Sequence, residues 1–216
     1  MGADAGGGYR FNKAWMVKEF RDDMKKNVYA IITKRRSIRR FQQKLIPFGV
    51  LEKLVNAARV APSSANFQPL EYVVIDDKDL LPEVFTTLKW AGYIAPEGDP
   101  PEGEKPTAYV VVLVNKEISD SGYERDVGAA VENILLVALE EGIGSCWIGS
   151  INKKRLRKIL NIPHFLAIDS VIALGYSTES PVMENMTDSV KYWKDESGTL
   201  HVPKRRLNNI FHRNKY

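Results

Sequence analysis

The stretch KRRSIRRFQQ concentrates positive charge, because five cationic side chains fall within the seven positions from Lys34 to Arg40. Arginine forks bind phosphate oxygens through paired hydrogen bonds, and the hydroxyl of Ser37 and backbone N–H groups could fill the remaining sites. The same cluster could instead be a solvated helix end, where cations oppose the negative end of the helix dipole. The residue types therefore indicate either capture of one small anion or an ordinary charged surface.

Two further stretches combine residues that commonly approach ligands. APSSANFQP, residues 61–69, is a stiff loop dense in donors and acceptors that could read the polar edge of a planar ligand, although an ordinary serine-rich turn has the same composition. GIGSCWIGS, residues 142–150, carries glycines that allow close approach of a ligand or of a neighbouring strand. Cys146 has no basic neighbour in the sequence, so we expect a small buried hydrophobe rather than a reactive thiolate.

A second cationic cluster, VPKRRL at residues 202–207, lies near the other end of the chain. A basic tail is usually solvated, and that interpretation stays open here. The alternative is that the two clusters share one anionic partner, since the first has no obvious acidic partner in its own stretch.

The composition predicts one large domain with a real core: 216 residues, 44% of them apolar, with a net charge of +4. A single cysteine excludes an intrachain disulfide, and three scattered histidines without ligand spacing predict no metal site. No stretch approaches the roughly 18 uncharged apolar residues of a membrane span. We therefore expect a cytoplasmic protein that does not enter the membrane, and interpret the glycine-rich start as a flexible tail rather than a signal peptide.

Apolar periodicity predicts the elements that must position these stretches. Helices are expected over residues 15–36 with a break near Asn27, and over 47–61, 125–142 and 152–160. Strands are expected over 71–77, 106–115 and 167–176, with a strand end and turn at 145–151. Residues 88–106 change from a helix-like pattern to a Pro/Gly/Glu-rich loop, long enough to be a lid. Beyond Pro181 the chain is expected to be polar and irregular. Helices and strands without a strict βαβ rhythm favour an α+β fold.

Taken in this order, five stretches resemble the FMN-dependent nitroreductase family: RRSIRRF, APSSANFQP, GAAVENILLVALEEGIGSCWIGS, IALGY and PKRRL. The resemblance covers roughly residues 28–207. It implies a central mixed β-sheet flanked by helices, an intertwined homodimer with exchanged C-terminal arms, and two FMN molecules at the subunit interface. It also divides the chain into an N-terminal extension at 1–27, an FMN-binding domain at 28–206 and a C-terminal arm at 207–216.

The resemblance also implies roles for individual residues, with FMN as the cofactor and NAD(P)H as the reducing co-substrate. Phosphate contacts would come from the two basic ends of the chain: Arg35, Arg36, Ser37, Lys204 and Arg206. The ring of FMN would meet Arg39 at its pyrimidine edge, the backbone at Ile148, Gly149 and Ser150 near its middle, and a loop of the other subunit through Pro62, Ser63, Ser64 and Asn66. Trp90 and Tyr93 are expected as aromatic walls of the substrate pocket, or alternatively as core-facing residues.

The reaction implied by this resemblance passes electrons from NAD(P)H to a nitroaromatic, a quinone or a similar small acceptor in two half-reactions. No side chain is expected to act as the catalytic acid or base, because the cofactor carries the chemistry. Within the same fold, a reductive dehalogenase resembling iodotyrosine deiodinase or a flavin-fragmenting enzyme stays open, as does an FMN-binding module without turnover. A nucleic-acid-binding protein is less favoured, because acidic residues nearly balance the basic ones and neither basic stretch contains interleaved aromatic residues.

Overall fold

The computed structural model describes residues 28–216, and the chain divides into two compact units, residues 1–35 and 36–216. In the first unit, residues 28–34 form a helix that ends within the basic cluster, as the sequence predicts. The predicted helix before Asn27 and the extension at 1–27 lie outside the described residues. Among the residues described, no helix is both long and apolar enough to cross a membrane.

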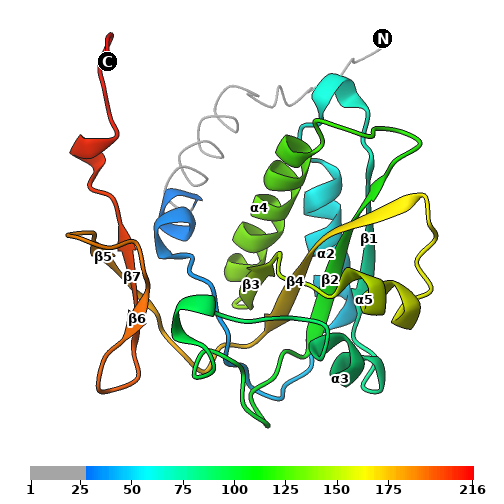
Figure 1. Cartoon of the computed structure of the whole chain (residues 1–216), viewed down its shortest axis with the longest axis horizontal. Helices are drawn as coiled ribbons and strands as arrows, with labels where there is room; N and C mark the ends of the chain where they lie inside the picture. The colour runs from blue at the N-terminus through cyan, green and yellow to red at the C-terminus, as the bar shows by residue number, and fades with distance from the viewer. Residues whose placement is uncertain (1–27) are drawn as a thin grey trace, which may run out of the picture. The chain divides into compact units, whose positions relative to one another are not determined.

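The second unit is built on a four-stranded sheet with the strand order β1-β2-β4-β3 (Figure 1). All three pairings are antiparallel, and a parallel bridge between Ser37 and Ser145 adds to the β3 edge. The bounds are β1 (Leu70–Ile75), β2 (Ala108–Asn115), β3 (Gly144–Ile148) and β4 (Leu166–Gly175). The predicted strands are thus confirmed, and the expected strand end at 145–151 is a full edge strand.

Strand β2 is buried on both faces, as its continuous apolar run predicts. Ala108, Val110 and Val112 belong to one core with the helices α2 (Phe48–Arg59) and α4 (Glu124–Glu140). Tyr109 and Val111 belong to a second core with α3 (Leu80–Phe85) and α5 (Lys153–Ile159). Figure 1 shows these two pairs of helices covering opposite faces of the sheet. The sheet therefore separates two hydrophobic cores.

Helix α4 has the apolar face that its sequence predicts. Six predicted positions are buried: Val127, Ala130, Val131, Ile134, Leu135 and Ala138. The helix ends in a Schellman motif, in which Gly142 N–H donates to Leu139 and Ile143 N–H donates to Ala138. Gly142 has a φ of +73°, which accounts for a glycine there. The chain reverses its direction at Gly142 and continues directly into β3.

The prediction of an irregular chain after Pro181 is wrong. A second sheet with the order β5-β7-β6 forms from β5 (Val182–Asn185), β6 (Trp193–Lys194) and β7 (Leu200–Lys204). β5 and β7 are parallel, whereas β6 and β7 are antiparallel. These strands are short and mix apolar with polar residues, so no apolar alternation predicts them. Short 3₁₀ turns complete the chain: η1 (Ser64–Asn66), η2 (Gly92–Ile94) and η3 (Leu207–Asn209).

His201 joins the three strands of this small sheet. Its Nδ1 lies 3.1 Å from Glu184 Oε2, its Nε2 lies 3.1 Å from Asp195 Oδ2, and its ring stacks on Trp193 at 4.2 Å. The hydrogen bond to Asp195 raises the pKa of His201, with Glu184 adding to the effect against partial burial. Hydrogen bonds from Ser197 and His201 lower the pKa of Asp195 to about 2. When it is protonated, this imidazole lies between two carboxylates and links the short strands.

We predict that the small sheet is more stable at mildly acidic than at alkaline pH. Because the pKa of His201 is raised on folding, its contribution is complete below the unfolded value of about 6.5 and is lost as pH rises through the folded pKa. Amide exchange in β7, corrected for intrinsic rates, should therefore show stronger protection at about pH 5.5 than at about pH 8.5. The variant His201→Gln should lose this difference, whereas His164→Gln, altering an exposed histidine, should keep it. Equal pH dependence in both variants would contradict the assignment.

Candidate functional site

The basic segment after the first helix is extended and runs beside β3. Ile38 N–H donates to the Ser145 carbonyl at 2.9 Å, next to the parallel bridge that Ser37 makes with Ser145. Ile38 and Phe41 are buried, while the side chains of Arg39 and Arg40 between them are only partly buried. Two apolar anchors therefore hold a cationic pair at the edge of the main sheet.

Two glycines make room for these anchors. A Cβ on Gly144 would come within 2.9 Å of the Ile38 side chain, and a Cβ on Gly175 would come within 2.7 Å of the Phe41 ring. Gly144 and Gly175 are direct partners in the β3–β4 register. The expectation that Gly144 allows a close approach is thus explained by a neighbouring strand.

Arg39 is positioned from two sides and has an unused donor. Its backbone N–H donates to Glu179 Oε1 at 2.5 Å, and its guanidinium lies over the Tyr192 ring at 5.2 Å. The Arg39 Nε atom is buried and finds no acceptor among the described residues. Buried donors are normally satisfied, so this nitrogen is a candidate donor to an acceptor on a ligand.

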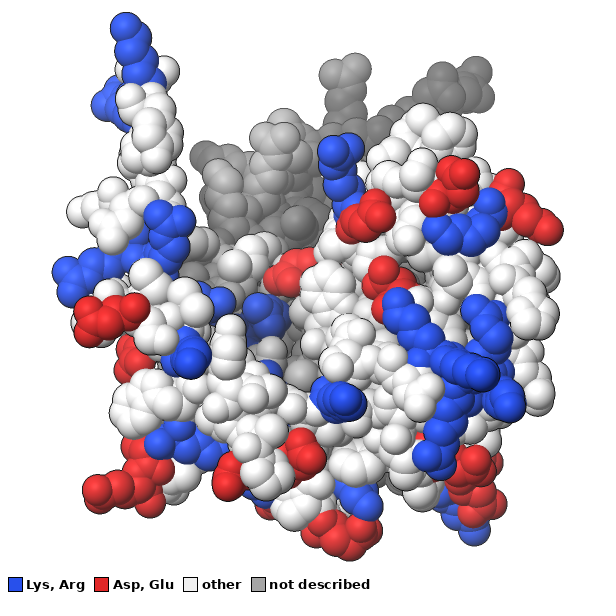
Figure 2. Space-filling model, viewed as in Figure 1, with Lys and Arg blue, Asp and Glu red and all other residues white. Residues whose placement is uncertain are grey.

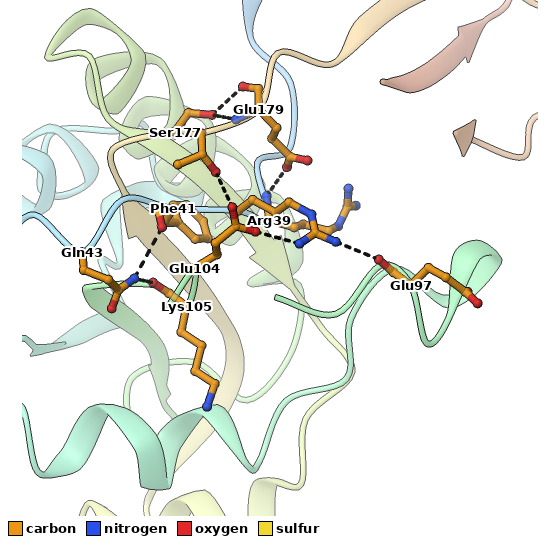
Figure 3. A network of polar contacts seen from close by, with 10 residues as sticks. Arg39, Phe41, Gln43, Glu97, Glu104, Lys105, Ser177 and Glu179 are labelled. Atoms are coloured by element: carbon orange, nitrogen blue, oxygen red, sulfur yellow. Dashed lines mark hydrogen bonds and ion pairs between the residues drawn. The ribbon is translucent and has the colours of Figure 1, made fainter. Parts of the chain in front are cut away.

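Arg40, in contrast, is committed to the loop that we predicted as a lid. Its Nη1 donates to Glu104 Oε2 at 2.7 Å and its Nη2 to the Glu97 carbonyl at 3.3 Å. Phe41 N–H donates to the Glu104 carbonyl, and the Gln43 amide donates to the Lys105 carbonyl (Figure 3). This end of the 88–106 loop is therefore fastened to the basic segment.

The other end of that loop is fastened beside β3. Lys89 N–H donates to the Ser150 carbonyl at 3.0 Å, and Leu88 bridges Ile151. Ile148 is buried, whereas Gly149 and Ser150 are exposed, and a Cβ on Gly149 would meet nothing within 4 Å. Space above Gly149 is thus open to a ligand.

The two predicted aromatic walls differ in burial. Trp90 is only 5% exposed and packs against Phe85 in the core, which matches the core-facing alternative. Tyr93 is 56% exposed and lies against Tyr192, with ring centroids 4.9 Å apart. Of the two, only Tyr93 presents its ring to solvent.

The loop from Pro62 to Gln68 has an unusual backbone. Ala65, Asn66 and Gln68 have φ values of 47°, 57° and 53°, which lie in a backbone region that residues other than glycine and asparagine rarely adopt. The Ser63 hydroxyl donates to Asp126 Oδ2 at 2.6 Å and accepts from Gln68 N–H, while Ser64 N–H donates to Asp126 Oδ1. Strain of this kind persists where the surroundings enforce it, and it concentrates at functional sites.

Asp126 is the residue that holds the loop, and it lies outside the motifs that the sequence presents. It is only 5% exposed, in the first turn of α4. Burial alone would raise the pKa of its carboxyl group, but hydrogen bonds from Ser63 and Ser64 lower it. A signal existed, because Asp126 shares the i, i+4 stripe with Ala130 and Ile134, where a carboxylate needs partners.

The same loop borders a cavity of about 150 Å³ between α2, β1 and α4, lined among others by Pro62, Gln68, Tyr72 and Asp126. Burial raises the pKa of Tyr72 to about 12, so its phenol is neutral at physiological pH. The cavity combines this neutral group with the carboxylate that fixes the loop.

Within a single chain, the residues that we predicted to contact the cofactor fall into separate groups. The loop at 62–66 is tied to the start of α4, whereas Ser37 is tied to Ser145 of β3, just beyond the other end of α4. This 17-residue helix spans roughly 25 Å. Lys204 and Arg206 are exposed, and the described residues show no hydrogen bond or ion pair between them and Arg39. Arg35 belongs to the first unit.

Positive charge is not confined to the predicted clusters. Figure 2 shows Lys and Arg side chains gathered over α5, whose sequence is KKRLRKI, and interspersed with acidic ones elsewhere on the visible face. Within α5, Arg157 is committed, because it donates to the carbonyls of Ile162 and Leu166. This surface was not singled out from the sequence.

Comparison with known proteins places the fold in a family. The model of the nitroreductase family matches residues 32–176. A protein of Archaeoglobus fulgidus, provisionally named an NADH dehydrogenase/NAD(P)H nitroreductase, is 35% identical over 153 residues, 68% of this chain and 83% of that protein. The solved structure of an FMN-dependent nitroreductase from Clostridium difficile has a TM-score of 0.62 at 26% identity, covering 86% of this chain and 98% of that one.

A third relative has the same fold at lower identity. The structure of a provisionally named nitroreductase from Desulfovibrio desulfuricans, solved in complex with FMN, has a TM-score of 0.62 at 22% identity. It covers 88% of this chain and 97% of its own. The fold and the matched family model agree with the resemblance expected from the motifs. This chain belongs to the nitroreductase family.

We predict that Gly175→Ala destabilises the protein by about 1–3 kcal/mol, because the new methyl group would overlap the Phe41 ring in a packed interior. Urea unfolding followed by fluorescence would measure the change in the free energy of unfolding. Gly49→Ala is the matched control, since a Cβ there meets nothing within 4 Å. If both variants were equally stable, the close approach would not be the constraint we describe.

We predict that Asp126→Asn lowers the free energy of unfolding by roughly 1–3 kcal/mol at neutral pH, because Ser63 loses its charged acceptor. The pKa of Asp126 is lowered on folding, so its contribution is present above the unfolded value of about 3.9 and is lost as pH falls through the folded pKa. Urea midpoints measured between about pH 3 and pH 7 should therefore converge for wild type and variant toward the acid end. Glu124→Gln, an exposed substitution in the same helical turn, should change neither the midpoint nor its pH dependence.

Proposed function

We propose that this chain is an FMN-dependent oxidoreductase that uses NAD(P)H to reduce nitroaromatic, quinone or similar small acceptors in a two-step reaction. The observation that carries the proposal is the unsatisfied buried donor of Arg39, on an extended basic segment beside β3, in a chain of the nitroreductase family. The names of its relatives include NAD(P)H and FMN, which supports the choice of both.

The residues present fit FMN on three counts. The buried Arg39 Nε needs an acceptor, which the carbonyls of a flavin pyrimidine ring would supply. Gly149 leaves open space where backbone could approach a planar ring. We assign the phosphate group to cations from both ends of the chain: Arg36 in the basic segment, and Lys204 and Arg206, which are exposed at and just after the end of β7.

In this proposal each group of residues has a separate task. Arg35, Arg36 and Ser37 hold the phosphate, and Lys204 and Arg206 close on it. Arg39 faces the pyrimidine edge, where its fixed charge stabilises negative charge on the two-electron reduced cofactor. Ile148, Gly149 and Ser150 present backbone to the middle of the ring. The loop residues Pro62, Ser63, Ser64 and Asn66 line the FMN of a second subunit.

We infer a homodimer from the distribution of these residues. The two groups that are tied to opposite ends of α4 are roughly 25 Å apart along the helix, so we assign them to the flavins of different subunits. A second copy would bring its own strained loop to the first copy's basic segment. Leu207, Ile210 and Phe211 are exposed apolar side chains after β7, and we assign them to an arm that packs on that partner.

When bound, FMN supplies the redox chemistry by accepting a hydride from NAD(P)H and returning two electrons to the acceptor. The chain contributes binding and shape. The 88–106 loop, fastened at both ends, bounds the open side, and Tyr93 offers an exposed ring to a planar nicotinamide or acceptor. No side chain of the described site is assigned as an acid or base.

We predict that the purified protein is yellow, with about one FMN per chain. The double variant Arg35→Ala/Arg206→Ala should weaken FMN binding at least tenfold, since each lost charged hydrogen bond is worth about 1.5–3 kcal/mol. Riboflavin, which lacks the phosphate, should bind both proteins equally. Fluorescence titration of the apoprotein measures all four constants, with Arg155→Ala on α5 as the matched control. Equal losses for FMN and riboflavin would exclude the phosphate assignment.

The activity itself is tested by stopped-flow reduction with NADH and NADPH, followed by a panel of nitroaromatics, quinones and halophenols. Rapid reduction and reoxidation by nitroaromatics or quinones is the expected result. Oxidation by halophenols alone would make the protein a dehalogenase, and flavin binding without turnover would make it a binding module. Either result contradicts the proposed reaction.

A further inference from the structure

Tyr192 contacts two residues of the candidate site that are far from it in the sequence. Its ring lies beneath the Arg39 guanidinium at 5.2 Å from Cζ to the ring centroid. The same ring packs against Tyr93 with centroids 4.9 Å apart at 56°, and Tyr93 N–H points to the Tyr192 hydroxyl at 3.5 Å. Tyr192 therefore links the basic segment to η2 on the 88–106 loop.

The position of Tyr192 is fixed from behind by the small sheet. Trp193, the next residue, stacks on His201 and donates its Nε1–H to Glu184 at 2.9 Å. Tyr192 itself packs partly buried against the second core. A ring backed in this way can hold a neighbouring guanidinium in one place.

The kind of contact matters, because a cation over an aromatic face is attracted to the ring without spending its N–H donors. Arg40 shows the opposite case, since Glu104 and Glu97 occupy its donors. The described residues give the Arg39 side chain no hydrogen bond or ion pair, and its Nε is buried. Tyr192 thus orients a guanidinium whose donors remain available for a ligand.

We propose that Tyr192 is the positioning residue that aims Arg39 at the pyrimidine edge of FMN, and that it forms with Tyr93 the aromatic wall of the acceptor pocket. This inference rests on the proposed function. Tyr93 presents its exposed ring beside Tyr192, so the wall favours planar aromatic acceptors over compact inorganic ones. Tyr192, rather than the buried Trp90, is the second member of this wall.

The experiment compares FMN-loaded Tyr192→Leu and Tyr192→Phe with wild type. The leucine variant should bind two-electron reduced FMN at least tenfold more weakly relative to oxidised FMN, which is a midpoint potential about 30 mV more negative. Its KM for a quinone should rise severalfold, while the KM for hexacyanoferrate(III) should not change. Phenylalanine keeps the ring, so it should preserve both values. Tyr123→Leu, which removes a ring under Lys116 at 4.0 Å outside the site, is the matched control.

A double-mutant cycle shows whether Tyr192 acts through Arg39. In the Arg39→Gln background, Tyr192→Leu should cause no further shift in potential. If the leucine variant fails to fold, pentafluorophenylalanine at position 192 keeps the ring shape and reverses its electrostatics, and should cause the same shift. An unchanged potential in Tyr192→Leu, or a shift that persists in the Arg39→Gln background, overturns the inference. The proposed function is upheld in that case as long as the wild-type protein binds FMN. Wild-type protein without FMN affinity overturns both.

Discussion

The approach of Ile38 and Phe41 to the paired glycines Gly144 and Gly175 is the contact on which the arrangement of the candidate site depends. Gly144 on β3 and Gly175 on β4 lie opposite each other and carry no side chains, so the basic segment can pack directly on the sheet. Burial of Ile38 and Phe41 is worth about 1.5–3 kcal/mol for each side chain. With these two residues fixed, Arg39 and Arg40 project from a rigid backbone. A cationic pair on a free helix end would have no such fixed direction.

The neighbouring cations Arg39 and Arg40 of this positively charged segment contact different kinds of partner. Arg40 is neutralised by Glu104, so it fastens the 88–106 loop and adds little net field to the site. Arg39 meets an aromatic face and a backbone contact to Glu179, neither of which occupies its side-chain donors. The distinction is physical, because a carboxylate satisfies a guanidinium whereas a ring only orients it. Under the proposed function, the adjacent residues Arg40 and Arg39 thereby serve structure and ligand binding separately.

The sequence predicted the elements whose stability comes from apolar periodicity and missed those stabilised by specific polar pairs. The buried face of α4 and the two-sided burial of β2 follow directly from the spacing of their apolar residues. The small sheet does not, because its strands of two to five residues are joined by His201, Glu184 and Asp195. For the candidate site, composition singled out the basic segment and the loop at 61–69. The residues that hold them, Asp126, Glu104 and Tyr192, lie far away in the sequence and carry no motif.

The loop at 62–68 shows why its support must come from within the chain. Its residues with positive φ each store on the order of 1–2 kcal/mol, so the shape persists only if the loop is tied down. Asp126 meets that need by accepting from both Ser63 and Ser64 at the start of α4. In the proposed dimer, the partner therefore receives a loop that is already shaped. Association would not have to order these residues, and the binding energy of FMN would not be spent on bending them.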